Sequence, residues 1–345
     1  MLYKIKMCVW ELTLRCNIHC LHCGSSANNQ TRKNELTTQE ALDVVEQLAE
    51  LGCENVVLSG GEPFLRKDWA TLALRMVDLG IRVSFISNGY LFNDDILDIL
   101  KVIRPVGTGF SLDGGCRETH DYIRGRKGVF DRCIKALNKC SKAGFYSSAI
   151  TTVHKMNFPE LDRILEILVE NGVRAWQLQT ATPQGRMPRE LALDENEFYS
   201  LAKFIAQKKK EYKNIIDVCE SDCIGYFGTL GNELNVNWRG CPAGMRVLGI
   251  ESDGTIKGCL SIHHGEKYEE GNVRERSLID IWNDKNSFSY NRRFNPENLK
   301  GICKECKYGS ICRGGCSEQA KSFTDSEFGS PFCIYNYEKT HGIIK

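Results

Sequence analysis

Between residues 37 and 213, stretches with apolar residues at helical spacing alternate with short apolar runs. The first helix has Thr37 or Thr38 as its expected N-cap and Glu40 as the acidic partner of a capping box. The apolar runs predict strands at 55–59, 81–86, 106–112, 147–153 and 174–179, and the spaced patterns predict helices at 37–51, 68–79, 94–103, 130–143, 160–170 and 194–213. Five or six such repeats indicate an α/β fold, a partial (β/α)6 TIM-type barrel with helices outside a parallel sheet. Ligands of such barrels bind at the carboxyl ends of the strands.

The pattern changes from about residue 225. Two short apolar runs, 247–250 and 255–259, flank a Ser-Asp-Gly turn and predict a β-hairpin, and 277–283 predicts a short helix. The remaining apolar runs are too few for a large core, so bound metal is expected to stabilise this region. We therefore expect a barrel over 1–195, a helical bridging segment over 196–235 and a small cysteine-rich domain over 236–345, which holds the β-hairpin and short helices.

Charge and composition narrow the possible classes of protein. The 345 residues include 45 basic and 44 acidic side chains, and this balance argues against a nucleic-acid partner. No apolar run reaches the roughly 18 residues of a membrane helix, and the N-terminus lacks the apolar region of a signal peptide. The expected location is therefore cytoplasmic, without a membrane partner. In a reducing compartment, the 17 cysteines indicate metal or redox chemistry and not disulfides.

Three cysteines near the N-terminus, Cys16, Cys20 and Cys23, have the spacing x3 and x2. Three thiolates can hold three irons of a cubane cluster and leave the fourth iron open for a cofactor or substrate. A zinc site with His19 or His22 as the fourth ligand is the alternative. A second motif, Gly60-Gly61-Glu62-Pro63, directly follows the strand expected at 55–59, although such residues also form ordinary turns.

Together with the β–α pattern, these two motifs resemble the radical S-adenosylmethionine (radical SAM) superfamily over about residues 8–190. The resemblance implies a [4Fe-4S] cluster whose open iron chelates S-adenosylmethionine and releases a 5′-deoxyadenosyl radical that abstracts hydrogen from a substrate. It implies Cys16, Cys20 and Cys23 as ligands of the catalytic cluster. The cofactor-binding residues that it implies are His22, Gly60, Gly61, Glu62, Pro63, Ser87, Asn88, Ser111, Asp113 and Arg124.

The C-terminal cysteines form a third motif. Their order is Cys241, Gly254-x4-Cys259, Cys303-x2-Cys306-x5-Cys312-x3-Cys316 and Cys333. Two zinc knuckles could use such spacing, but the full order resembles the SPASM domain, a module with auxiliary iron–sulfur clusters. The resemblance implies one auxiliary cluster on Cys303, Cys306, Cys312 and Cys333, and part of another on Cys241, Cys259 and Cys316.

Three cubane clusters with one open iron need eleven ligands, whereas the motifs supply ten cysteines. Either Cys219 or Cys223 is the eleventh ligand, or this ligand is absent and a second iron stays open. Cys223 could instead donate hydrogen to a substrate radical, as a catalytic residue, or be an ordinary buried cysteine. We interpret Cys8, Cys53, Cys133 and Cys140 as structural.

The family resemblance favours an enzyme that cross-links, oxidises or epimerises a ribosomally made precursor peptide. Because the triad begins at residue 16, a separate leader-recognition protein or direct docking of the leader is expected. A flavodoxin- or ferredoxin-type protein is the expected electron donor. The alternatives are radical chemistry on a sugar alcohol or a tetrapyrrole side chain, and a zinc-bearing nucleic-acid-binding protein. Relatives that mature sulfatases have an acidic residue directly after the cysteine that corresponds to Cys259. The residue here is Leu260, so sulfatase maturation is disfavoured.

Several residues are candidates for contact with the substrate. Gln177 and Gln179 lie on the last expected barrel strand and would line the substrate space if they point inward. The candidates for a general base are Glu220, Asp222, Tyr226, His263 and His264.

Overall fold

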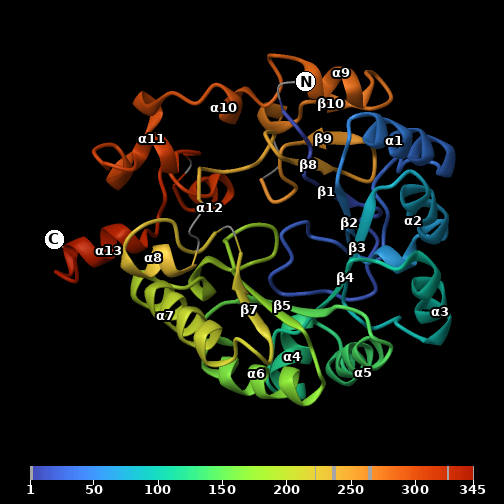
Figure 1. Cartoon of the computed structure of the whole chain (residues 1–345), viewed down its shortest axis with the longest axis horizontal. Coiled ribbons are helices and arrows are strands. Elements are labelled where there is room, and N and C mark those ends of the chain that lie inside the picture. The colour runs from blue at the N-terminus through green and yellow to red at the C-terminus, as the bar shows by residue number, and fades with distance from the viewer. Residues whose placement is uncertain (1–2, 222, 235–237, 263–265, 325, 345) are drawn as a thin grey trace.

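The computed structural model describes residues 3–221, 223–234, 238–262, 266–324 and 326–344. Within these ranges one sheet of ten strands has the order β10-β9-β8-β1-β2-β3-β4-β5-β6-β7 (Figure 1). Neighbouring strands from β1 to β7 are parallel. The pairs β8–β9 and β9–β10 are antiparallel. The strands are β1 (Met7–Glu11), β2 (Asn55–Ser59), β3 (Arg82–Ser87), β4 (Gly107–Ser111), β5 (Ser147–Val153), β6 (Ala175–Thr180), β7 (Asp217–Glu220), β8 (Val247–Ile250), β9 (Thr255–Lys257) and β10 (Gly271–Asn272).

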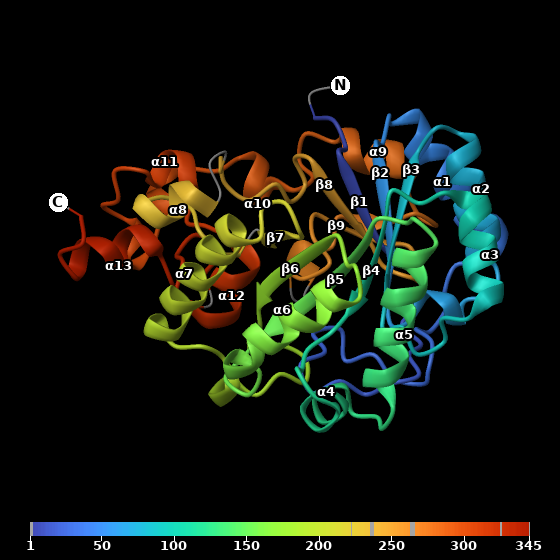
Figure 2. The same ribbon diagram turned by 60° about the horizontal axis from the view of Figure 1, so that its bottom comes forward.

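Helices surround the curved sheet on its outer side, as expected for a partial barrel (Figure 2). The sheet stays open, because β7 and β10 at its two ends do not pair with each other. The barrel helices are α1 (Thr38–Glu50), α2 (Trp69–Asp78), α3 (Asp94–Ile103), α4 (Arg117–Arg124), α5 (Val129–Lys142), α6 (Leu161–Glu170) and α7 (Glu195–Glu211). The shorter C-terminal helices are α8 (Thr229–Leu234), α9 (Leu278–Asn283), α10 (Ser289–Arg292), α11 (Gly309–Cys312), α12 (Ser317–Thr324) and α13 (Ile334–Thr340).

The predicted barrel elements from residue 37 to residue 211 are present, with ends within two residues of those expected. The capping box at the first helix is confirmed: the Thr37 side chain accepts from the Glu40 amide, and the Glu40 carboxylate accepts from the Thr37 amide. This reciprocal pairing satisfies donors that the first turn of a helix leaves free. Local sequence signals therefore determine where these elements begin.

Strands β1 and β7 and helix α4 do not appear among the predicted elements. Strand β7 spans only Asp217–Glu220, with the sequence DVCE, too short for a periodic signal. Its position is decided by pairing with β6, from Ala175↔Asp217 to Leu178↔Glu220. The segment 196–235 is therefore not wholly helical, and its separation from the barrel remains a prediction.

The C-terminal hairpin joins the barrel sheet directly, because β8 pairs in parallel with β1. Ile256 of β9, Trp282 of α9 and Phe288 pack in the same core cluster as barrel residues such as Trp10. The cysteine-rich region therefore shares a hydrophobic core with the barrel, which the sequence pattern did not predict.

Buried charges bridge the same junction. Arg32 donates to Glu11 of β1 at 2.6 Å and lies 3.2 Å from Glu251, which follows β8. Glu251 also pairs at 2.9 Å with Lys257 of β9, whose side chain is fully buried. Buried charges must be paired in this way, because a lone charge inside a protein carries a large desolvation cost.

In the part of the chain that the structure describes, no helix is both long enough and apolar enough to cross a membrane.

We expect Trp282→Ala to destabilise the barrel as well as the cysteine-rich region. Trp282 is 1% exposed and its indole nitrogen donates to the Tyr3 carbonyl at 3.2 Å. Loss of this side chain should lower the free energy of unfolding by about 3–5 kcal/mol. Guanidinium denaturation followed by helical circular dichroism measures it, with the exposed Val102→Ala as the control. An unchanged barrel transition would contradict the shared core.

Candidate functional site

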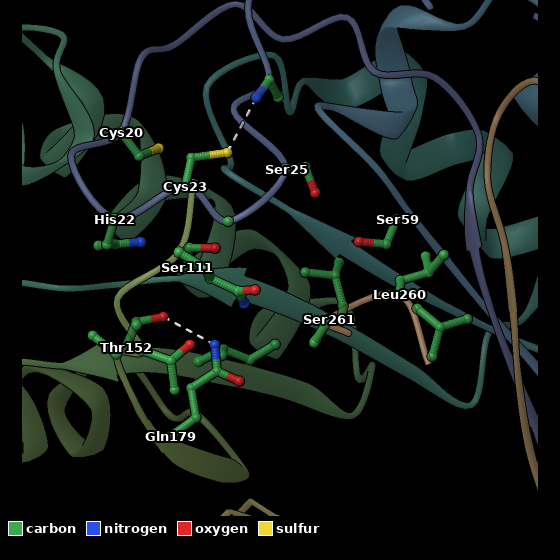
Figure 3. A pocket seen from close by; sticks show the side chains of 18 of the residues that line it. Cys20, His22, Cys23, Ser25, Ser59, Ser111, Thr152, Gln179, Leu260 and Ser261 are labelled. Atoms are coloured by element: carbon green, nitrogen blue, oxygen red, sulfur yellow. Dashed lines mark hydrogen bonds between the residues drawn. The ribbon is translucent and has the colours of Figure 1, made fainter. Parts of the chain in front are cut away.

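One cavity of about 480 Å³ lies at the carboxyl ends of the barrel strands. Cys16, Cys20 and Cys23 line one part of it. Side chains from β4, β5 and β6 follow, and Figure 3 shows Ser111, Thr152 and Gln179 on the same side of the view as the cysteine loop, with Leu260 and Ser261 on the opposite side. The C-terminal cysteines Cys259 and Cys316 line the same cavity. The fold therefore brings residues from both cysteine-rich ends of the chain to one space.

The loop that carries the first three cysteines is held close to the barrel by glycines. A β-carbon at Gly61 would collide with the carbonyl oxygens of Leu14 and Arg15. Gly125 ends α4 with a φ of +67°, and a β-carbon there would collide with the His19 carbonyl. Any larger residue at Gly61, the second glycine of the Gly60-Gly61 pair, would push the loop away from the barrel.

The three cysteines offer a donor set that fits an iron–sulfur cluster. The Ala27 amide donates to Cys23 Sγ at 3.3 Å, and Asn88 Nδ2 lies 3.8 Å from Cys16 Sγ. N–H groups directed at sulfur stabilise the anionic thiolates of such clusters. Arg124 Nε, in the cavity wall, is buried without a hydrogen-bond partner among the described residues and is available to a bound group.

The zinc alternative fits less well. Among the described residues, no three His, Cys, Asp or Glu side chains converge on the point that a single metal ion would occupy. The three thiols instead line one cavity, in which a cluster larger than a single ion would contact all of them.

Asp113, which follows β4, connects four parts of the site. Its Oδ2 accepts from His22 Nε2 and from Arg124 Nη1, both at 2.9 Å, and its Oδ1 accepts from the Thr152 amide at 2.8 Å. Its own amide donates to His120 Nδ1 at 3.1 Å. The resemblance to the family placed His22, Asp113 and Arg124 in one site, and the structure brings them together.

This network keeps Asp113 and Arg124 charged. Burial alone would raise the pKa of Asp113, but His22 and Arg124 together hold it well below its usual value of 3.8. The pKa of Arg124 is raised, because its thiol and carboxylate neighbours outweigh burial. Burial, followed by the charge of Arg124, lowers the pKa of His120 to about 4, so this imidazole is neutral near pH 7.

Glu62 lies behind the cavity wall. Its carboxylate accepts from Ser87 Oγ at 2.8 Å and from the Asn88 amide at 2.9 Å, and the side chain is fully buried. Burial raises its pKa to about 7, against the hydrogen bonds from Asn88 and Ser87. Gly60 and Gly61 line the cavity, whereas Glu62 and the buried Pro63 support the strand ends from behind.

The structure separates the two candidates for the eleventh ligand. Cys223 lines the cavity with Cys259 and Cys316, and its sulfur lies 3.3 Å from Thr180 Oγ1. Cys219, on β7, instead directs its sulfur to the Trp176 carbonyl at 3.6 Å and does not line the cavity.

Cys241 completes a group of four thiols with Cys223, Cys259 and Cys316. It packs with Cys259 in a small apolar cluster. Burial raises the pKa of Cys316, and Cys241 and Cys223 are near enough to raise it further.

The remaining motif cysteines form a separate group. Cys303, Cys306, Cys312 and Cys333 line a second cavity of about 340 Å³. The four cysteines that the family resemblance assigned to one cluster thus lie around one cavity. Cys8, Cys53, Cys133 and Cys140 are buried and line neither cavity, and none of the 17 cysteines forms a disulfide.

The candidates for a general base are less well placed. Glu220 pairs with Lys209 at 3.2 Å, and the Tyr226 hydroxyl accepts from the Cys316 amide at 2.9 Å. Asp222, His263 and His264 lie outside the described residues.

Sequence reasoning missed three acidic residues that line the cavity: Glu11 and Glu251 at the junction with the hairpin, and Glu318. Glu318 lies on α12, and its Oε1 accepts from Thr182 at 2.7 Å and from Ser322 at 2.8 Å. No motif marked it, and its position two residues after Cys316 was the only available signal.

Comparison with known proteins agrees with this geometry. Residues 10–184 match the radical SAM superfamily, and residues 241–307 match a SPASM iron–sulfur cluster-binding domain. The chain is 30% identical to the AdoMet-dependent heme synthase of Methanosarcina barkeri, over 96% of both chains. It is 28% identical to the PqqA peptide cyclase of Rhizobium meliloti, over 94% of this chain and 85% of the other.

The solved structure of Streptococcus suis SuiB bound to precursor peptide SuiA has a similar fold. Its TM-score is 0.78 at 19% identity, over 95% of this chain and 75% of that chain.

We expect Asp113→Asn to destabilise the chain strongly. The amide cannot accept from both His22 and Arg124 as the carboxylate does, so a buried cation loses its partner. Such a loss typically costs about 3–5 kcal/mol. Denaturant unfolding measures the change. Asp98→Asn, which removes an exposed ion pair with Lys101, is the control and should cost at most about 1 kcal/mol. Equal losses in both variants would show that Asp113 has no such role.

Proposed function

Because the chain belongs to the radical SAM superfamily and carries a SPASM domain, we propose that this enzyme modifies a ribosomally made precursor peptide. One observation carries this proposal: a single cavity is lined by the N-terminal cysteine triad and by C-terminal cysteines, with uncharged hydrogen-bonding side chains between them. A substrate held there would lie between the two groups of thiols. It would exchange hydrogen bonds with the amide and hydroxyl groups of the walls, which also carry the carboxylate of Glu318.

The residues of the barrel end would hold the catalytic [4Fe-4S] cluster and S-adenosylmethionine. When bound, these groups supply a radical that removes a hydrogen atom from the substrate. Cys16, Cys20 and Cys23 would be the cluster ligands, and Asn88 would stabilise the Cys16 thiolate. The residues proposed to contact or support S-adenosylmethionine are His22, Gly60, Gly61, Glu62, Pro63, Ser87, Asn88, Ser111, Asp113 and Arg124.

The polar groups of the cavity support a peptide substrate. Gln177 and Gln179 of β6 line it, as does Thr152 of β5, which accepts from Gln179 Nε2 at 2.9 Å. Amide and hydroxyl groups of this kind both donate and accept, as a peptide backbone does.

The charged groups of the cavity also favour a peptide substrate. Of its two arginines among the described lining residues, Arg124 pairs with Asp113 and leaves Nε for a bound group, and Arg186 donates to backbone carbonyls. A polycarboxylate substrate would need cations that remain available.

A tetrapyrrole side chain is the second candidate substrate. The observation that favours it is the 30% identity to an AdoMet-dependent heme synthase over 96% of both chains. A peptide substrate has comparable support from the PqqA peptide cyclase at 28% identity. The engaged arginines of the cavity favour the peptide.

Mass spectrometry of reaction products tests the proposal. The anaerobically reconstituted enzyme would receive S-adenosylmethionine, dithionite and either a short peptide encoded beside its gene or a carboxylated iron tetrapyrrole. Loss of two hydrogens from the peptide is expected for a cross-link or oxidation. Gain of one deuterium in deuterated water is expected for epimerisation. Cys20→Ala is the inactive control. A mass change of the tetrapyrrole alone would establish the second candidate instead.

The thiol groups support two auxiliary clusters, which makes three clusters in total. Cys303, Cys306, Cys312 and Cys333 would hold one of them. Cys241, Cys259 and Cys316 would hold the other, with Cys223 as the eleventh ligand.

Iron content tests the assignment of Cys223. The wild-type chain should bind about twelve irons, and Cys223→Ala should destabilise one cluster and bind closer to about eight. Cys219→Ala, which changes a cysteine outside the cavity, is the matched control and should retain the wild-type iron content. Full iron content in Cys223→Ala with an altered product would instead assign Cys223 as the hydrogen donor.

A further inference from the structure

Two exposed arginines gather around one tyrosine on the surface beside the cysteine loop. The guanidinium carbons of Arg126 and Arg132 lie 3.9 Å and 4.2 Å from the centre of the Tyr90 ring. Arg126 donates to the Tyr90 hydroxyl at 2.9 Å, and Arg132 donates to the Tyr90 carbonyl at 3.0 Å. We name Tyr90, Arg126 and Arg132 the arginine–tyrosine patch.

This patch touches the loop of the catalytic cysteines. The ring of Tyr90 packs against the apolar cluster that contains Cys16 and Cys20. Arg126 donates to the Asn17 carbonyl, one residue after Cys16. Figure 2 shows this loop, which follows β1, next to the turn between α4 and α5 that carries Arg126.

A short chain of hydrogen bonds leads from the patch to a thiol. The Tyr90 amide donates to Asn88 Oδ1 at 2.8 Å. The Nδ2 of the same Asn88 donates to Asn17 Oδ1 at 2.8 Å and lies 3.8 Å from Cys16 Sγ. None of the three patch residues lines the substrate cavity, so the patch is a surface separate from the cavity.

The patch is a local excess of positive charge. Neither Arg126 nor Arg132 forms an ion pair with a carboxylate of the described residues, whereas the exposed Arg117 and Arg163 do. The exposed Lys127 follows Arg126 directly. Because the whole chain carries a net charge of only +1, this excess distinguishes the patch from the average surface. Unpaired arginines attract a partner of opposite charge and accelerate its association.

We propose that the arginine–tyrosine patch docks an acidic, low-potential one-electron carrier of the flavodoxin or ferredoxin type. One electron leaves the reduced carrier and enters the oxidised cluster on Cys16, Cys20 and Cys23, with no transfer of atoms. The proposal rests on the cluster of the proposed function, but not on the peptide substrate. Docking here leaves the substrate cavity free while the carrier is bound.

A second cationic surface provides the rival docking site. Lys304 and Lys307 are exposed beside Cys303 and Cys306, and Lys307 lies over the Tyr308 ring at 5.0 Å. A carrier bound there would face the C-terminal cysteines and not the catalytic loop. Charge reversal at each surface in turn distinguishes the two sites.

The test compares variants of the cluster-loaded chain for binding of a purified acidic flavodoxin. Arg126→Glu with Arg132→Glu should weaken binding at least about tenfold at low salt, measured by fluorescence anisotropy. The difference should shrink at about 0.5 M salt, where the charges are screened. The yield of cluster reduced by flavodoxin, measured by electron paramagnetic resonance, should fall in parallel.

Lys142→Glu with Lys213→Glu makes the same change of charge and should bind as the wild type does. These exposed lysines precede β5 and β7, at the amino ends of the strands, the end of the barrel opposite to the cysteine loop. Iron content and the signal after dithionite reduction show that each variant has kept its cluster. If the arginine variant loses its cluster, Lys127→Glu replaces it and should weaken binding severalfold at low salt.

Unchanged affinity in a patch variant with an intact cluster would overturn the proposal. So would a loss of affinity confined to Lys304→Glu with Lys307→Glu. A wild-type chain without iron would overturn the proposed function instead, and the relative affinities of the variants would still decide the docking site.

Discussion

The geometry of the site depends on the buried carboxylate of Asp113. It holds the cysteine loop through His22, the end of α4 through Arg124 and the end of β5 through Thr152. These segments come from distant parts of the sequence, and each brings a donor to the same two oxygens. Because a buried carboxylate without partners is costly, and so is a buried arginine, the segments are stable only when they meet.

A second constraint relates the two ends of the chain. Strand β1 lies between β2 of the barrel and β8 of the C-terminal hairpin. The strand that leads into the cysteine triad therefore also positions the hairpin that leads into Cys259. The buried charges of Glu11, Arg32 and Glu251 and the shared apolar core stabilise the same junction. The distance between the two thiol groups is thus set by a continuous sheet and not by a flexible linker.

Charge is distributed unevenly around the cysteine loop. On the cavity side, Arg124 is neutralised by Asp113, and the strands contribute amide and hydroxyl groups. On the outer side, Arg126 and Arg132 have no carboxylate partner among the described residues and surround Tyr90. The cavity side therefore suits a substrate that exchanges hydrogen bonds with amide and hydroxyl groups, and the outer side an acidic protein, and one loop would serve both. Such a separation lets electron delivery and substrate binding proceed without competition for space.

Apart from α4, the sequence by itself determined the barrel elements between residues 37 and 211, because apolar periodicity and caps such as Thr37–Glu40 act over a few residues. It also identified the cysteine motifs, and their resemblance to the SPASM domain implied which of these cysteines form a group. It could not place β7, whose four residues become a strand by pairing with β6, nor find Glu318, which no motif marks. Only the tertiary structure distinguished Cys223 from Cys219, since one sulfur faces the cavity and the other a backbone carbonyl. Contacts between distant segments depend on how the sheet curves and which strands pair, and local patterns in a sequence do not contain that information.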